Sequence, residues 1–249
     1  MVRKIREKLH QTSPEAAKLL QRWSVIMGAV IIISNVVATR IWSLTELLRQ
    51  IFGWQLSGWP EITFDAGLII FPVAYIYGDL LSEIFGRKIA DAVAYSCCVM
   101  CAIFFGTLWL ADFLPSPTGM TNIVFTNALE LSMPVILGSI AGYLVQQLLN
   151  NWVFAYLRKR TSEDSFLVRS WLSSIPARIA DTLVFNTVAF GWRMSWAELL
   201  PHMLYAYIAA TILEFTFSLF VKPYVKKLKA KLGLHAGPIE RLDYVQPQA

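Results

Sequence analysis

The sequence predicts an all-α, polytopic membrane protein with six transmembrane helices and both termini in the cytoplasm. Three observations predict this fold class. The 249 residues are 56% hydrophobic and only 16% charged, whereas soluble domains carry about a quarter charged residues. The apolar residues gather into blocks of roughly 20, the length that crosses a hydrocarbon core of about 30 Å. Most of the basic residues lie in alternate loops and at the two ends of the chain.

The chain divides into three predicted parts. Residues 1–22 are expected to form a basic, amphipathic cytoplasmic helix, because Ser13 before Pro14 is typical of a helix start and no signal cleavage site follows. Residues 23–222 hold the six-span membrane domain, and residues 223–249 form a basic cytoplasmic tail. The predicted spans are 23–43, 66–86, 89–111, 129–157, 166–191 and 199–222, with a short amphipathic helix in the outer loop 44–65.

The net charge of +5 marks topology and not a nucleic-acid partner. Of the 22 lysines and arginines, 17 lie in segments 3–22, 87–88, 158–160 and 222–241. The alternate loops hold only Arg49 and Arg193. Basic residues favour the cytoplasmic side of short loops, so the four basic segments orient the helices.

Asp79 and Glu83 are four residues apart on one face of the second predicted span. An ionisable group in hydrocarbon costs about 2.5–3.5 kcal/mol, so each needs a polar partner, a cavity or a function. Glu83 could instead snorkel beside Arg87 and Lys88 at the cytoplasmic end of the helix. Asp79 has no basic residue within one turn on its face.

Further polar side chains lie inside the other predicted spans. Arg178 and Asp181, three residues apart, could form a pair within one helix. The amide side chains of the first and fourth spans could form hydrogen bonds between helices. The three cysteines Cys97, Cys98 and Cys101 favour small apolar packing over a metal site. A polar interior shared by many helices nevertheless indicates a binding cavity or a transport path.

These polar positions fall within motifs of a known family. The second span carries FPxxYxxxDxxxEIFG, and the fifth carries SSIPARIADTLVF followed by AF. The first span contributes ISNVVA, and the fourth contributes GSIAGYLVQQLLNNWVF. Over about residues 25–222 the chain resembles the queuosine precursor transporters, also called the vitamin uptake transporter family. It departs from the family pattern at Asn150 and Arg178, and it lacks the usual lysine of the last span.

The resemblance implies an inner-membrane protein of bacteria that imports 7-cyano-7-deazaguanine or its aminomethyl relative for tRNA modification. It implies a deazapurine substrate and the lipid bilayer as partners, no nucleic acid, no cofactor and no metal; a homodimer is a possible assembly. We expect the Asp79 carboxylate to accept both donors of a guanine-like edge. We expect the ring of Tyr75, Tyr77 or Phe185 to stack on the base. The predicted substrate-binding residues are Asn35, Tyr75, Asp79, Glu83, Gln147, Asn150, Arg178, Asp181, Phe185 and Glu214.

Two other functions are compatible with the residues. The chain could import another nucleobase or vitamin, or serve as the substrate-binding subunit of a larger importer. It could also be an intramembrane aspartyl hydrolase, with Asp79 and Asp181 as the two acids. The usual glycine-x-glycine-aspartate signature of such enzymes is absent from the sequence. We therefore expect no enzymatic activity and no catalytic residues.

Overall fold

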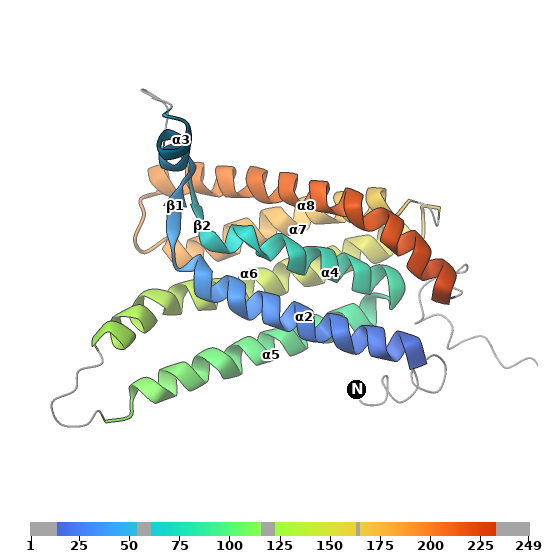
Figure 1. Ribbon diagram of the computed structural model, residues 1–249, viewed down its shortest axis with the longest axis horizontal. Coiled ribbons are helices and arrows are strands. Elements are labelled where there is room, and N and C mark those ends of the chain that lie inside the picture. The colour runs from blue at the N-terminus through green and yellow to red at the C-terminus, as the bar shows by residue number, and fades with distance from the viewer. Residues whose placement is uncertain (1–13, 54–60, 116–122, 163–164, 233–249) are drawn as a thin grey trace, which may run out of the picture.

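The computed structural model describes residues 14–53, 61–115, 123–162 and 165–232. Its long helices run side by side in one bundle (Figure 1). The prediction of an all-α membrane protein is confirmed, and each of the six predicted spans contains a helix. The helices are α2 (Pro14–Ala38), α3 (Leu44–Phe52), α4 (Phe71–Ile84), α5 (Arg87–Asp112), α6 (Ile123–Arg158), α7 (Phe166–Phe190) and α8 (Trp196–Leu232).

The outer faces of the bundle are apolar. By length and composition, α2, α5 and α8 can each cross a membrane. Large apolar side chains stand exposed along these helices, as expected where lipid replaces water. They include Val25, Ile33, Val99, Ile103, Leu110, Leu204, Ile212 and Phe220. The number of spans and the side on which each terminus lies stay predictions.

The first predicted span is wrong at its end. It was expected to run to residue 43, but α2 ends at Ala38 and the chain turns into strand β1 (Ile41–Ser43). This strand pairs antiparallel with β2 (Thr63–Asp65), where Ile41 lies opposite Asp65. The strand hydrogen bonds take up backbone groups that a longer helix would have satisfied internally.

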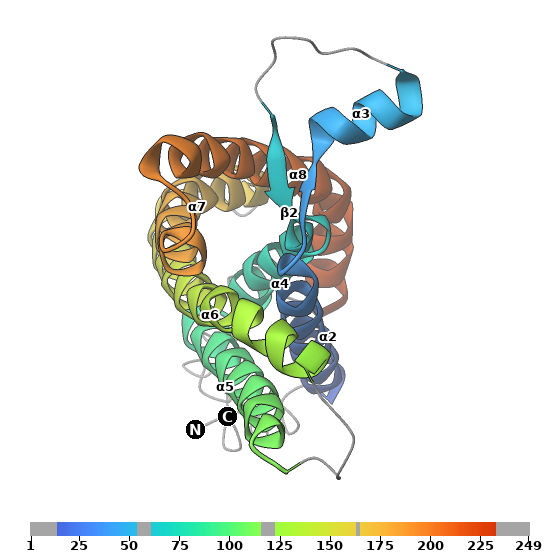
Figure 2. The ribbon, with the colours of Figure 1, turned by 90° about the vertical axis from the view of Figure 1, so that its left-hand side faces the viewer.

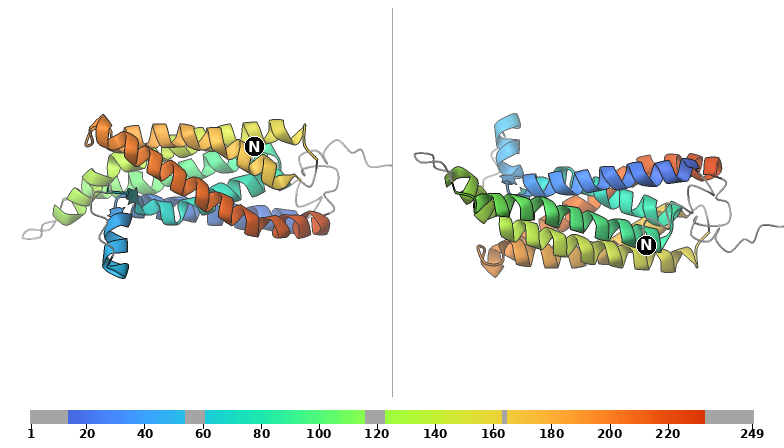
Figure 3. Two further views of the ribbon diagram at one scale, coloured as in Figure 1. Left: turned by 90° about the horizontal axis from the view of Figure 1, so that it is seen from above. Right: turned by 90° about the horizontal axis from the view of Figure 1, so that it is seen from below.

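The amphipathic helix predicted in the outer loop is confirmed as α3. The Ser43 side chain accepts a hydrogen bond from the backbone N–H of Glu46, which caps the helix start. Gly53 ends it with a positive φ of 68°. Figures 2 and 3 show α3 projecting sideways from one end of the bundle, beside β1 and β2. We call this the ribbon end. Trp54 and Trp59 lie outside the described residues.

The second predicted span, 66–86, contains a shorter helix than expected. A 3-10 turn, η1 (Ala66–Ile69), precedes the 14-residue α4, which is about 21 Å long at 1.5 Å per residue. Pro72 stands in the first turn of α4, so this proline starts the helix and does not kink it. Gly86 follows with a φ of 90°, a conformation that favours glycine.

α4 is surrounded by protein. Eleven of its 14 residues are buried, and it packs against α2, α5, α6 and α8. Its acids therefore face other helices and not lipid. The flanking helices continue beyond the predicted boundaries, since α2 passes residue 22 without a break and α8 extends to Leu232. Residues 1–13 and 233–249 lie outside the described residues.

The charge asymmetry gives a prediction about topology. Reporter fusions after Lys88 and Arg160 should report the cytoplasm, and fusions after Gly53 and Met194 should report the outside. Activity of a cytoplasm-specific and an outside-specific reporter at each site is the measurement. One inverted loop among the four would contradict the six-span arrangement.

Candidate functional site

One face of α4 carries Tyr75, Asp79 and Glu83, each one helical turn after the last. All three side chains are buried. Each meets polar groups of the antiparallel helix α7, at Asp181, Ser170 and Arg169 respectively. The face therefore forms three polar levels, which run from the ribbon end of the bundle to the opposite end.

At the first level lies a pocket with a cavity of about 70 Å³. This is several times the roughly 10–15 Å³ that one water needs. The Tyr75 hydroxyl donates a hydrogen bond of 2.5 Å to Asp181 Oδ2. The polar and aromatic residues that line the pocket are Asn35, Asp65, Phe71, Tyr75, Ser139, Arg178, Asp181, Thr182, Phe185 and Asn186.

Asp65 reaches this pocket from β2, outside the spanning helices. Its carboxylate accepts hydrogen bonds from the backbone N–H groups of Gly67 and Leu68. A Cβ at position 67 would stand 2.8 Å from Asp65 Oδ1 and 3.0 Å from the Ser34 carbonyl oxygen, so glycine is needed for this close approach. Burial raises the pKa of Asp65 to about 6 despite these hydrogen bonds.

Arg178 belongs to the pocket wall and pairs across helices. Its guanidinium forms an ion pair with Glu214 of α8, which also accepts a hydrogen bond from the Ser174 hydroxyl. The same guanidinium lies 4.2 Å from the centre of the Tyr75 ring. The alternative in which Arg178 and Asp181 simply pair within α7 is thus replaced by two contacts between helices, to α8 and to α4.

The second level is centred on Asp79, which is 1% exposed. One carboxylate oxygen accepts a 2.7 Å hydrogen bond from Asn150 Nδ2, and the other accepts from the Ser170 hydroxyl. Asp79 therefore links α4 to α6 and α7. Nearby, Asn151 joins three helices, since it accepts from Ser82 and donates to Asp91.

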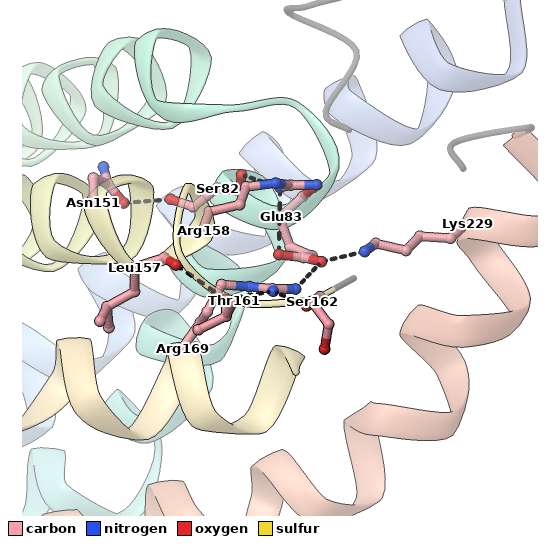
Figure 4. Close-up of polar contacts among 9 residues, drawn as sticks. All are labelled: Ser82, Glu83, Asn151, Leu157, Arg158, Thr161, Ser162, Arg169 and Lys229. Carbon is pink, nitrogen blue, oxygen red and sulfur yellow. Dashed lines mark hydrogen bonds and ion pairs between the residues drawn. The ribbon is translucent and has the colours of Figure 1, made fainter. Parts of the chain in front are cut away.

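The third level is an ion-pair cluster around Glu83, shown in Figure 4. The carboxylate is fully buried and contacts Arg158 of α6 at 3.3 Å and Arg169 of α7 at 2.8 Å. Lys229 of α8 contacts the same carboxylate. Arg87 pairs with Asp91 instead, so the suggestion that Glu83 rests beside Arg87 is wrong. Glu83 joins the ends of four helices.

The structure divides the ten predicted substrate-binding residues into two groups. Five of them line the pocket: Asn35, Tyr75, Arg178, Asp181 and Phe185. The other five lie behind the pocket wall or further along the polar face: Asp79, Glu83, Gln147, Asn150 and Glu214. Tyr77, considered as a stacking ring, packs against Trp23 at a centroid distance of 6.0 Å.

Sequence reasoning missed several residues of this interior. Asp65 was assigned to an outer loop, and nothing in its neighbours showed that β2 would carry it back to the bundle. Arg158 and Lys229 were interpreted only as topology signals, although both contact Glu83. Asn186 had a usable signal, since it follows Thr182 by one turn on the pocket side of α7.

A bundle of apolar helices around a pocket with polar walls is the arrangement of a membrane transport protein. Residues 65–225, well over half of the chain, match the family model described as "Putative vitamin uptake transporter". The chain belongs to this vitamin uptake transporter family. No curated protein and no solved structure matches it. Within the described residues, no group of three or more His, Cys, Asp or Glu side chains could hold a metal ion.

The buried pair of Arg178 and Glu214 gives a prediction about stability. Changing either residue to Gln strands the other charge, so each single variant should lose about 3–5 kcal/mol of folding free energy. The double variant Arg178→Gln/Glu214→Gln should recover most of this loss. Thermal unfolding of the purified protein in detergent measures it. The control is Arg178→Gln/Asp181→Asn, and equal recovery there would contradict the pairing across α7 and α8.

The half-buried Asp65 gives a prediction about pH. Because the folded pKa lies near 6, above the usual 3.8, the folded state binds this proton more tightly than the unfolded chain does. The stability that the folded state gains from this tighter proton binding is complete below about pH 4 and is lost as the pH rises to about 6. Asp65→Asn removes this loss, so its melting temperature should exceed that of the wild type by a few degrees at pH 7.

The same comparison at about pH 4 should show little difference. Glu61→Gln removes an exposed acid just before the same strand and is the control for the loss of one negative charge. A pH-independent difference between Asp65→Asn and the wild type would refute the prediction.

Proposed function

We propose that this protein imports a queuosine precursor, 7-cyano-7-deazaguanine or its aminomethyl relative, across the inner membrane of bacteria for tRNA modification. The observation that carries the proposal is the pocket at the first level. It combines acceptor oxygens, one guanidinium and three aromatic rings around a single cavity. A guanine-like base has matching groups, namely adjacent N–H donors, a carbonyl acceptor and a flat face.

Several acceptor oxygens of the pocket receive no hydrogen bond from the protein. Asn35 Oδ1 and Asn186 Oδ1 are buried and have no hydrogen-bond partner. Asp181 accepts from Tyr75 through Oδ2, which leaves Oδ1 for a ligand. Buried polar atoms without partners are costly, so a ligand rich in N–H donors suits these walls. Arg178 Nε is a donor without a hydrogen-bond partner and suits the carbonyl of the base.

Asp181 is the better choice for the donor edge of the base. The motif had suggested Asp79, but both oxygens of Asp79 already accept hydrogen bonds and it does not line the cavity. In the proposal, Tyr75 and Phe185 hold the flat face of the base. Asp79 positions α4 against α6 and α7, one turn below.

The Glu83 cluster is suited to close the opposite end of the path. A carboxylate that contacts cations of α6, α7 and α8 holds four helix ends together. Release of a substrate on that side requires these contacts to separate. Buried ion pairs offset their desolvation cost only when their geometry is good. The Glu83 contacts therefore favour one defined arrangement of these helix ends.

Import of another vitamin or nucleobase is the second candidate. It is favoured by the family description, which refers to vitamin uptake in general. The same pocket chemistry applies to any flat heterocycle with adjacent N–H donors. Uptake by vesicles that contain only this chain would separate a self-sufficient importer from the subunit of a larger one.

The exocyclic amine of the ligand tests the proposed contact between Asp181 and the donor edge of the base. The wild type should bind 7-cyano-7-deazaguanine roughly tenfold more tightly than an analogue without the exocyclic amine, since an unpaired buried acceptor costs about 1–3 kcal/mol. Asp181→Asn should lose this discrimination. Calorimetric titration of the purified protein with both ligands measures it.

Asp79→Asn is the matched control. Because Asp79 contacts only protein groups, this variant should weaken both ligands equally and keep the discrimination. If Asp79→Asn removes the discrimination and Asp181→Asn keeps it, the original assignment to Asp79 is restored. If the wild type binds neither ligand, the proposed substrate class is wrong.

A further inference from the structure

The pocket has a surplus of negative charge. Asp65 and Asp181 line it from β2 and α7, and Arg178 is the one cation among its lining residues in the described part of the chain. The guanidinium of Arg178 is already paired with Glu214. Three carboxylates therefore share one guanidinium within a largely buried region.

The other groups around Asp65 and Asp181 are neutral or directed elsewhere. Tyr75 of α4 and the backbone of Gly67 and Leu68 donate hydrogen bonds but carry no charge. Among the other charged or titratable residues described on adjoining elements, Arg40 before β1 has an exposed side chain. His202 of α8 contacts Thr63 and the Phe190 ring and does not line the pocket.

A second observation points to a bound cation. Asn35 and Asn186 line the pocket, are 1% and 2% exposed, and their side-chain oxygens have no hydrogen-bond partner. These are acceptor oxygens of the kind that coordinate a small cation or receive a donor. The pocket therefore combines unneutralised carboxylates with free acceptor oxygens.

We propose that Asp65 and Asp181 bind one monovalent cation together with the transported substrate, and that this cation drives uptake. The inference rests on the proposed function, because it places the cation in the same pocket as the base. Three sources share the chemistry: a proton added to a carboxylate oxygen, a sodium ion held by the oxygens, or the ammonium group of an aminomethyl substrate. Two partly buried carboxylates beside one committed guanidinium are costly in free energy when both are ionised. The pKa of Asp65 is raised to about 6, so this carboxyl can take up a proton at a pH close to neutral.

The first experiment uses the purified full-length protein without substrate. Infrared difference spectra between about pH 5 and about pH 8 should show the carbonyl stretch of a protonated carboxylic acid. Asp65→Asn or Asp181→Asn should remove or shift this band, and Glu61→Gln should leave it unchanged. Sodium chloride, compared with choline chloride, should instead raise the melting temperature if sodium is the cation, and this shift should vanish in both Asp variants.

The second experiment measures uptake into vesicles that contain only this protein. For one charge per substrate, an inside-negative potential of about 60 mV supports roughly tenfold accumulation. Neutral 7-cyano-7-deazaguanine should respond to the potential and to either a proton or a sodium gradient. If the substrate's own ammonium is the cation, only the aminomethyl compound responds to the potential, and neither ion gradient is needed. Asp65→Asn and Asp181→Asn should lose the response to the potential.

The two experiments separate failure of this inference from failure of the proposed function. Uptake of either compound that ignores the potential and both gradients, with no titrating carboxyl band and no sodium shift, would overturn the cation site. A carboxyl band or sodium shift that depends on Asp65 and Asp181, with no uptake of either compound, would keep the cation site and refute the deazaguanine substrate.

Discussion

The whole interior depends on burying the polar face of α4. A charged group without partners in a membrane interior is unstable, so Asp79 and Glu83 can occupy α4 only if other helices surround them with donors. Asn150 and Ser170 serve Asp79, and cations from three helices serve Glu83. In return, each acid fixes the distance and rotation of the helices that it contacts. The short, almost completely buried α4 is thus the element around which α6, α7 and α8 are arranged.

The polar face also separates two environments along one helix. At the ribbon end the carboxylates of Asp65 and Asp181 dominate a cavity, and at the opposite end cations gather around Glu83. Between them Asp79 is surrounded by neutral donors. A flat, donor-rich ligand is therefore attracted to one end only. This asymmetry follows from which helix ends meet at each level, and it gives the path a direction.

The sequence was sufficient for the helices and for the depth of the polar residues, because apolar blocks and positive-inside charge have direct physical causes. It was not sufficient for partners. Spacing suggested that Arg178 could pair with Asp181, three residues away, but tertiary packing placed Glu214 of another helix beside it. Asp65 illustrates the same limit, since its role depends on a two-stranded ribbon whose pairing spans 20 residues. Long-range pairing of this kind leaves no local periodicity to detect.

The geometry of α4 gives a physical route by which the two ends can influence each other. Tyr75 and Glu83 are eight residues apart, about 12 Å along an unbroken helix at 1.5 Å per residue. A ligand that donates to Asp181 Oδ1 shares this carboxylate with the Tyr75 hydroxyl, so its binding bears directly on the contact that holds the first level. α4 has no proline beyond its first turn, and Gly86, with a φ of 90°, separates it from α5, so α4 is one unbroken unit between the two levels. Glu83 stands one turn before the end of α4 and contacts cations of α6, α7 and α8. In the proposed transport cycle, binding at the pocket and separation of the Glu83 contacts would therefore act on the same helix.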